Sequence, residues 1–231
     1  MLERMPPQLY YITDRRQFPG DGKEQERRLL EKIRECAASG VDYIQLREKD
    51  LSIRALEELA HKAMAAVRGP AARLLINSRT DVALACGAHG VHLPAGDLQA
   101  SEVRAVVSLL NQSLPNQTLL NQSRAGSARP ILGVSAHSQT EVAFAEAHGA
   151  DFAVFAPVFE KAGAVNAAGL EQLRRICRRG NAAALPMPVF ALGGVTLENA
   201  RLCVEAGAAG IAGIRLFQEN DIAKVVGSLQ R

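Results

Sequence analysis

The stretch AASGVDYIQLR at residues 37–47 decides the fold, because three later segments repeat its plan. The repeats are ACGAHGVHLP (85–94), AHGADFAVFAP (147–157) and EAGAAGIAGIR (205–215). Each begins with an alanine-containing helix tail and continues through a glycine into a short apolar run. A glycine suits the left-handed turn that ends a helix, and the run after it suits a strand covered on both faces. Each segment therefore predicts a joint between a helix and a buried strand.

Further strand-like runs lie between these joints. They are LYYIT (9–13), RLLIN (73–77), ILGVS (131–135) and PVFAL (188–192). Amphipathic stretches with a helical period separate the runs, for example residues 24–38 and 52–67. Regular alternation of strands and helices implies a parallel sheet. Eight such units in this length predict an α/β fold, a single (β/α)8 TIM barrel domain with a closed sheet over residues 1–231. An open doubly wound sheet is the alternative, but no G-x-G-x-x-G follows the first strand.

One stretch interrupts the alternation. Residues 111–129 are polar and contain a proline and a degenerate repeat. Such a tract predicts a surface insertion between the fourth helix and the fifth strand.

Composition excludes several classes of protein. The 27 basic and 24 acidic residues leave a net charge of +3, far from the basic footprint of a nucleic-acid binder. No apolar run approaches the ~20 residues that span a membrane, and the first residues lack the apolar core of a signal peptide. We therefore expect a cytoplasmic protein. The four cysteines form no C-x-x-C pair, which favours buried reduced thiols.

Polar residues gather where the predicted strands end, and active sites of such barrels lie at that end. Gln45, Arg47 and Lys49 alternate, so they can face one way and hold a phosphate or diphosphate; a solvated charged turn is the alternative. Gly193 and Gly194 offer backbone N–H groups to an anion, although a glycine pair also suits a tight turn.

The histidines and carboxylates divide by position. His137 follows a strand at the rim and is the best candidate for a general acid or base. His92 lies inside a strand, where a hydrogen-bonded core histidine is the preferred interpretation. The others, His61, His89 and His148, are expected at the surface. Asp97 is the best carboxylate for Mg2+, with Glu48 and Asp50 behind it, and no spacing suggests zinc.

The motifs, taken together, resemble one family. QLREKD (45–50), LLINSRTDVALACGAHGVHLPAGD (74–97), GVSAHS (133–138), GADFAVFAPVF (149–159) and ALGGVTLENA (191–200) follow the order seen in the thiamine phosphate synthase and TenI superfamily. The resemblance implies a (β/α)8 barrel and small phosphorylated substrates. Its barrel faces are often paired, which leaves a homodimer open.

The resemblance also implies roles for individual residues. Gln45, Arg47, Lys49 and Asn77 match contacts to a pyrimidine diphosphate, and Asp97 matches one magnesium ligand. Ser135 and His137 match residues that line the pyrimidine or thiazole site and carry the chemistry. Gly193 and Gly194 match the site of the thiazole phosphate.

Three departures separate this chain from the synthases. Ser78 stands where they carry an aspartate that binds metal. The loop PVFEKAGAVNAAG (157–169) lacks the threonines that hold pyrophosphate, and Lys161 is out of register. Arg215 replaces a serine-containing strand end and is expected to supply charge to a phosphate instead.

These departures favour a TenI-like thiazole tautomerase, in which His137 moves a proton without a metal. A thiamine phosphate synthase that couples a pyrimidine diphosphate to a thiazole phosphate with Mg2+ is the alternative. A non-catalytic barrel that binds a phosphorylated ligand is the third hypothesis.

Overall fold

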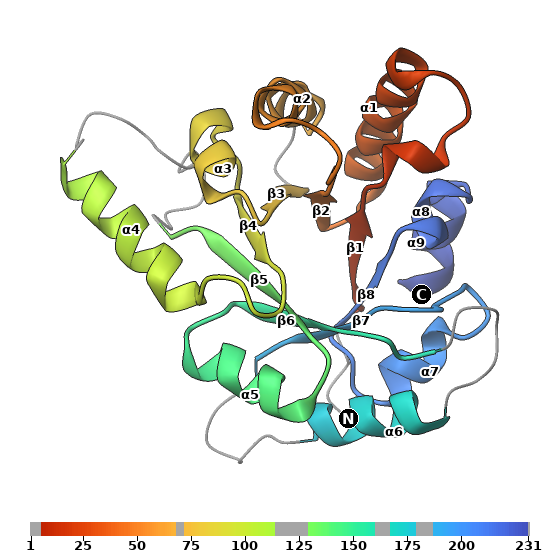
Figure 1. Cartoon of the computed structure of the whole chain (residues 1–231). Helices are drawn as coiled ribbons and strands as arrows, with labels where there is room; N and C mark the ends of the chain where they lie inside the picture. Colours follow the sequence, from red (N-terminus) through yellow and green to blue (C-terminus); the bar gives the residue numbers. More distant parts are fainter. Residues whose placement is uncertain (1–5, 68–71, 114–128, 160–166, 179–186, 231) are drawn as a thin grey trace.

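The strands close into a parallel barrel (Figure 1) in the computed structural model, which describes residues 6–67, 72–113, 129–159, 167–178 and 187–230. Strand order follows the chain, and the last strand pairs with the first. The strands are β1 (Gln8–Ile12), β2 (Tyr43–Leu46), β3 (Arg73–Asn77), β4 (Gly90–Leu93), β5 (Ile131–Ala136), β6 (Phe152–Phe155), β7 (Val189–Ala191) and β8 (Gly210–Gly213). The predicted (β/α)8 barrel is confirmed.

Helices surround the strands as an outer layer (Figure 1). They are η1 (Arg15–Gln17), α1 (Gly22–Ser39), α2 (Ile53–Ala66), α3 (Thr80–Cys86), α4 (Ala100–Ser113), α5 (Gln139–Ala147), α6 (Ala167–Cys177), α7 (Ala200–Glu205), α8 (Arg215–Gln218) and α9 (Ile222–Leu229). None of the helices in the described ranges is long and apolar enough to span a membrane.

Local signals set where several helices begin and end. The side chains of Asp21, Ser52 and Ser138 accept hydrogen bonds from the first turns of α1, α2 and α5. The four glycines of the repeated joints all have a positive φ, as the joint pattern predicts. Helix α4 extends to Ser113, so the start of the predicted insertion is helical, and residues 114–128 lie outside the described ranges.

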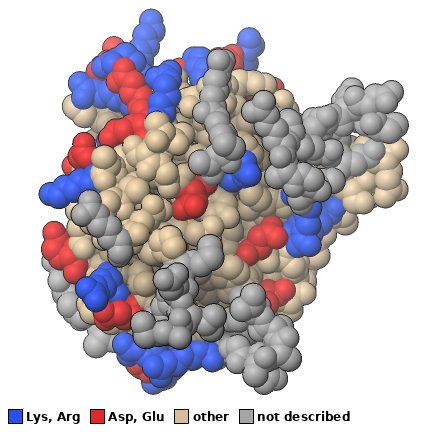
Figure 2. Space-filling view, turned by 180° about the vertical axis from the view of Figure 1, so that it is seen from behind, with Lys and Arg blue, Asp and Glu red and all other residues tan. Residues whose placement is uncertain are grey.

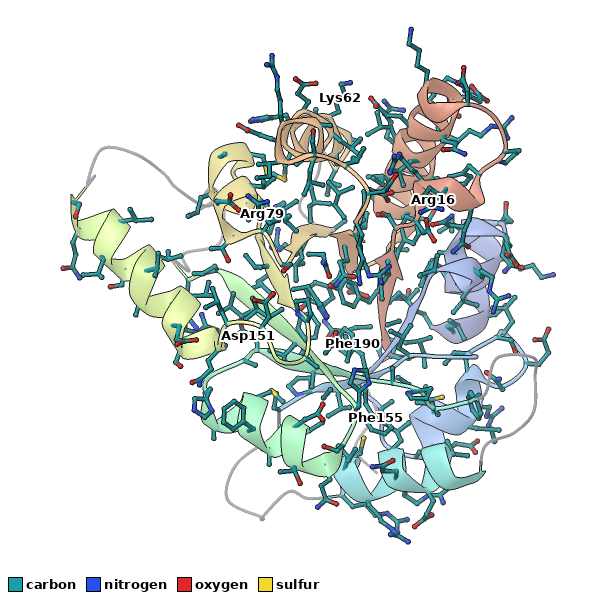
Figure 3. All side chains as sticks on the ribbon, in the orientation of Figure 1. Arg16, Lys62, Arg79, Asp151, Phe155 and Phe190 are labelled. Carbon is teal, nitrogen blue, oxygen red and sulfur yellow. The ribbon has the colours of Figure 1, made fainter. Side chains whose placement is uncertain are left out.

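Large side chains fill the interior of the barrel. The rings of Phe152 and Phe190 stack with their centroids 4.9 Å apart, and Tyr10 meets Phe152 edge-on at 5.5 Å. Phe190 lies among the strands in the middle of Figure 3. A Cβ on Gly133 would come within 2.4 Å of the Phe152 ring, so this strand position must stay free of a side chain. A second, larger cluster packs between the strands and the helices.

At three of the four repeated joints, the residue before the strand makes two hydrogen bonds to one residue of a neighbouring strand. We call this pair of bonds a clamp. The N–H of Asp42 donates to the carbonyl of Leu9, and the Asp42 carboxylate accepts the Leu9 N–H at 2.8 Å. The same pair of bonds joins Asp151 to Leu132, and Asp151 is labelled in Figure 3. At the fourth joint the equivalent residue is Ala209, which makes the backbone bond alone. The clamps therefore fix how neighbouring strands align.

His89 forms the remaining clamp, so its predicted surface role is wrong. Its N–H donates to the carbonyl of Leu74, and its ring nitrogen Nδ1 accepts the Leu74 N–H at 3.0 Å. Accepting through Nδ1 requires a neutral ring. Burial, with a smaller contribution from Arg73, lowers the pKa of His89 from 6.5 to about 4.

The His89 clamp makes stability depend on pH. The unfolded chain takes up a proton near pH 6.5, whereas folded His89 resists it until about pH 4. The unfolded state thus holds more protons in this window, and the stability from neutral His89 is lost as pH falls from 6.5 toward 4. The loss is at most about 1.4 kcal/mol per pH unit. Urea denaturation at several pH values measures this loss of unfolding free energy.

His89→Asn is the matched control, because it leaves every other titrating group in place. We expect its unfolding free energy to fall less steeply with acidification than that of the unchanged protein. Parallel curves for the two proteins would show that His89 does not hold the clamp in its neutral form.

Candidate active site

A chain of hydrogen bonds crosses the barrel interior near the mouth, the opening at the C-terminal ends of the strands. Gln45 Nε2 donates to the Tyr10 hydroxyl at 3.1 Å, and that hydroxyl contacts His92 Nδ1 at 3.1 Å. His92 Nε2 in turn contacts Ser135 Oγ at 2.9 Å. These side chains come from β2, β1, β4 and β5. Two predicted site residues, Gln45 and Ser135, are therefore connected through Tyr10 and His92.

His92 is neutral in this setting. Its ring is almost fully buried, and burial is the larger cause that lowers its pKa from 6.5 to about 3. The nearby positive charge of Arg47 is the second cause. Arg47 is itself half-buried, and across the described ranges its guanidinium has no hydrogen-bond or ion-pair partner.

The segment after β2 is held by a buried carboxylate. Glu48 is 5% exposed and accepts the Thr13 hydroxyl at 2.6 Å as well as the N–H and guanidinium of Arg15. Burial raises the pKa of Glu48, while Thr13 and Arg15 oppose the rise. Arg15 also binds Asp50 through two bonds of 2.7 Å. Glu48 and Asp50 therefore serve this ion-pair network, which corrects their placement as reserve metal ligands.

Thr13 connects that network to Arg47. Its hydroxyl accepts the Arg47 N–H at 2.9 Å while donating to Glu48. Lys49, two residues after Arg47, is exposed and has no hydrogen-bond or ion-pair partner within the ranges that the structure covers. The network thus fixes the backbone from which Arg47 and Lys49 extend, two cations that no described carboxylate neutralises.

Asp97 pairs with Ser78 at the ends of β3 and β4. The Ser78 hydroxyl donates to Asp97 Oδ2 at 2.6 Å, and Asp97 Oδ1 accepts the Leu98 N–H at 2.8 Å. Ser78 has a φ of 65°, a conformation that suits asparagine and aspartate better than serine. Half-buried Asn77 is aligned with His92 in the sheet. In the described residues, no group of three or more His, Cys, Asp or Glu forms a metal site.

His137 lies at the rim beyond β5 and is exposed. Its Nδ1 is 2.7 Å from the carbonyl oxygen of Ala156. Because that oxygen can only accept, Nδ1 carries the proton, and Nε2 is the basic nitrogen of the neutral ring. The His137 N–H donates to the Glu141 carboxylate at 2.7 Å. The ring is therefore oriented to take a proton through Nε2.

A cavity of about 1210 Å³ opens beside the ends of β7 and β8. Gly193, Gly194, Gly213 and Arg215 line it, as does Pro157. The two glycines after β7 have φ values of 96° and 64°, and a Cβ on Gly193 would lie 2.9 Å from the Cα of Pro157. In the described lining, Arg215 is the one cation, beside Glu198 and Glu219.

The predicted residues thus fall into separate groups. Gly193, Gly194 and Arg215 share the cavity, Ser78 and Asp97 form a pair, and Gln45 joins Ser135 through the buried chain. Lys161 and most of the loop 157–169 lie outside the described ranges. Tyr10 was missed, although side chains alternate along a strand and Tyr10 must therefore lie on the same side of β1 as Ile12. Figure 2 shows that charges of both signs are interspersed on the face that it presents.

The comparisons with known proteins agree on one family. The sequence pattern described as thiamine monophosphate synthase matches residues 9–128 and 116–217. The "Putative thiamine-phosphate synthase 2" of Aquifex aeolicus is 38% identical over 92% of this chain and 98% of its own length. The "Thiamine-phosphate synthase" of Syntrophomonas wolfei is 34% identical over 88% of this chain and 85% of its own.

A solved structure is similar as well. It is the thiamine phosphate pyrophosphorylase from Pyrococcus furiosus, with a TM-score of 0.68 and 30% identity. The similarity covers 96% of this chain and 93% of that one.

Proposed function

From the premise that the chain belongs to the thiamine monophosphate synthase family of enzymes, we propose that it is itself a thiamine phosphate synthase. It would couple a pyrimidine diphosphate to a thiazole phosphate and release pyrophosphate. The names of its relatives support this reaction over the tautomerase that the sequence departures favoured.

The observation that carries the proposal is that groups suited to anions lie at two separate places on the mouth. Arg47 and Lys49 extend from the end of β2, whereas Gly193, Gly194 and Arg215 lie by the cavity at β7 and β8. A diphosphate needs more than one positive charge, and Arg47 and Lys49, which have no ion-pair partner among the described residues, would supply that need together with a metal ion at Asp97. The tautomerase substrate carries a carboxylate besides its phosphate, and that single charge could be met by Arg47 alone.

The remaining residues take roles between these regions. Backbone N–H groups of Gly193 and Gly194 hold the thiazole phosphate, and Arg215 adds charge. Gln45, Asn77 and Ser135 contact the pyrimidine, and His137 stands at the rim between the two rings. The cations at β2 stabilise the negative charge that grows on the leaving pyrophosphate.

Mg2+ fits this site through a limited set of protein ligands. Mg2+ in such sites is bound through one or two carboxylates together with substrate phosphates and waters. Asp97 would supply one carboxylate, and the Ser78 hydroxyl, which donates to it at 2.6 Å, would supply a second oxygen. When bound, the ion would neutralise charge on the diphosphate.

The tautomerase is retained as a second candidate because of the geometry of His137. Its Nδ1 is occupied by the Ala156 carbonyl, which leaves Nε2 available to move a proton on a bound thiazole. Ser78 in place of a carboxylate also matches a reaction that needs no metal.

A coupling assay tests the proposed reaction. Purified protein with both synthase substrates and Mg2+ should form thiamine phosphate, and Arg47→Gln should lower kcat/KM roughly 10-fold to 100-fold, the value of a charged hydrogen bond. Arg175→Gln is the control, because Arg175 is an exposed arginine in the last turn of α6, at the end of the helix opposite the mouth.

Isomerisation of the thiazole carboxylate phosphate without coupling would instead establish the tautomerase. In that case His137→Asn should abolish isomerisation. Binding of a phosphorylated ligand without either reaction would leave a non-catalytic barrel.

Ser78→Asp tests the metal site. A second carboxylate beside Asp97 should tighten Mg2+ binding in the presence of pyrophosphate by about tenfold, and isothermal titration calorimetry measures this without turnover. Ser78→Asn is the matched control, because it shares the preference for positive φ and adds no charge. Equal Mg2+ affinity in the two variants would place the metal elsewhere.

A further inference from the structure

We infer that Tyr10 and His92 are positioning residues whose hydrogen bonds run in one direction and fix Ser135 as a donor toward the substrate. This inference rests on the proposed function for its consequence in catalysis. The direction of these hydrogen bonds follows from the structure of the ligand-free protein alone.

The direction is set at Tyr10. Its hydroxyl is fully buried and accepts a hydrogen bond from Gln45 Nε2, which can only donate. The hydroxyl proton then needs an acceptor, and His92 Nδ1 at 3.1 Å is the one that the described residues offer. If Nδ1 carried a proton instead, the Tyr10 hydroxyl proton would be buried without a partner, a state that folded proteins rarely tolerate.

The tautomer of His92 follows from that step. With Nδ1 accepting and the ring neutral, the proton of the ring lies on Nε2. Nε2 therefore donates to Ser135 Oγ at 2.9 Å. The imidazole acts as a rigid link between β1 and β5, and neighbouring rings of Tyr10 and Phe152 pack against it.

The two ends of the chain then present defined groups to a ligand. Ser135 Oγ accepts from His92, so its own O–H proton is directed elsewhere, and Ser135 is only partly buried. Gln45 uses one N–H on Tyr10, and its carbonyl oxygen has no partner across the described ranges. Ser135 thus offers a donor and Gln45 an acceptor, which suits a heterocycle with a ring nitrogen and an amino group.

Nuclear magnetic resonance of the ring nitrogens tests the direction in the free protein. Long-range proton–nitrogen spectra distinguish protonated from bare ring nitrogens in each of the five histidines, and His92→Asn assigns the signals of His92. We expect a proton on Nε2 and a bare Nδ1 at pH 7. A proton on Nδ1 would overturn the inference, whatever reaction the protein catalyses.

Tyr10→Phe tests the consequence for binding. The substitution removes one hydroxyl and should raise the KM for the pyrimidine diphosphate about fivefold to tenfold, while the KM for the thiazole phosphate stays the same. It should also release His92 into a mixture of tautomers.

Tyr11→Phe is the matched control. Tyr11 is the next residue of β1, is equally buried, and loses one hydrogen bond to Gln218 on the other face of the strand. It should change neither KM. Equal effects of the two variants on the KM for the pyrimidine diphosphate would show that Tyr10 has only a structural role. Absence of coupling in the unchanged protein would refute the proposed function, but it would leave the assigned tautomer of His92 standing.

Discussion

The alignment of neighbouring strands is the constraint on which the rest of this structure depends. In a barrel whose strands are buried on both faces, a shift of one residue turns every inward side chain outward. The clamps of Asp42, His89 and Asp151 oppose such shifts at three joints, each through two hydrogen bonds to one residue of a neighbouring strand. The polar chain at the mouth can exist only in the alignment that they maintain.

That alignment brings a different kind of chemical group to each part of the mouth. Inward positions of β1, β2, β4 and β5 supply neutral polar groups that point at one another. The segment after β2 supplies cations, because Glu48 is already occupied by Thr13 and Arg15 and does not neutralise Arg47. The ends of β7 and β8 supply backbone N–H groups and line the cavity. The proposed site for two phosphorylated substrates would combine groups from separate strands.

The fold could be predicted because its signal is repeated. Each joint combines a glycine at a helix end with a short apolar strand, and these local preferences agree with the tertiary structure. The position of Gln45, Gly193 and Arg215 at the mouth followed for the same reason, since parallel strands bring their carboxyl ends together.

Partners of buried polar groups could not be predicted in this way. His89 was expected at the surface because nothing local shows that its ring folds back onto Leu74. Glu48 and Asp50 resembled spare metal ligands until Arg15, from another strand end, was seen to bind both. Tyr10 and His92 meet across strands separated by 82 residues, and periodicity carries no information on such contacts.

The proposed reaction requires the mouth to hold two anions at once, one by Arg47 and Lys49 and one by Gly193, Gly194 and Arg215. Calorimetric titration with pyrophosphate and Mg2+, in the absence and presence of saturating thiazole phosphate, tests it most directly. Pyrophosphate should bind with one site per chain in both titrations. Displacement of one ligand by the other would show a single shared site and contradict the account.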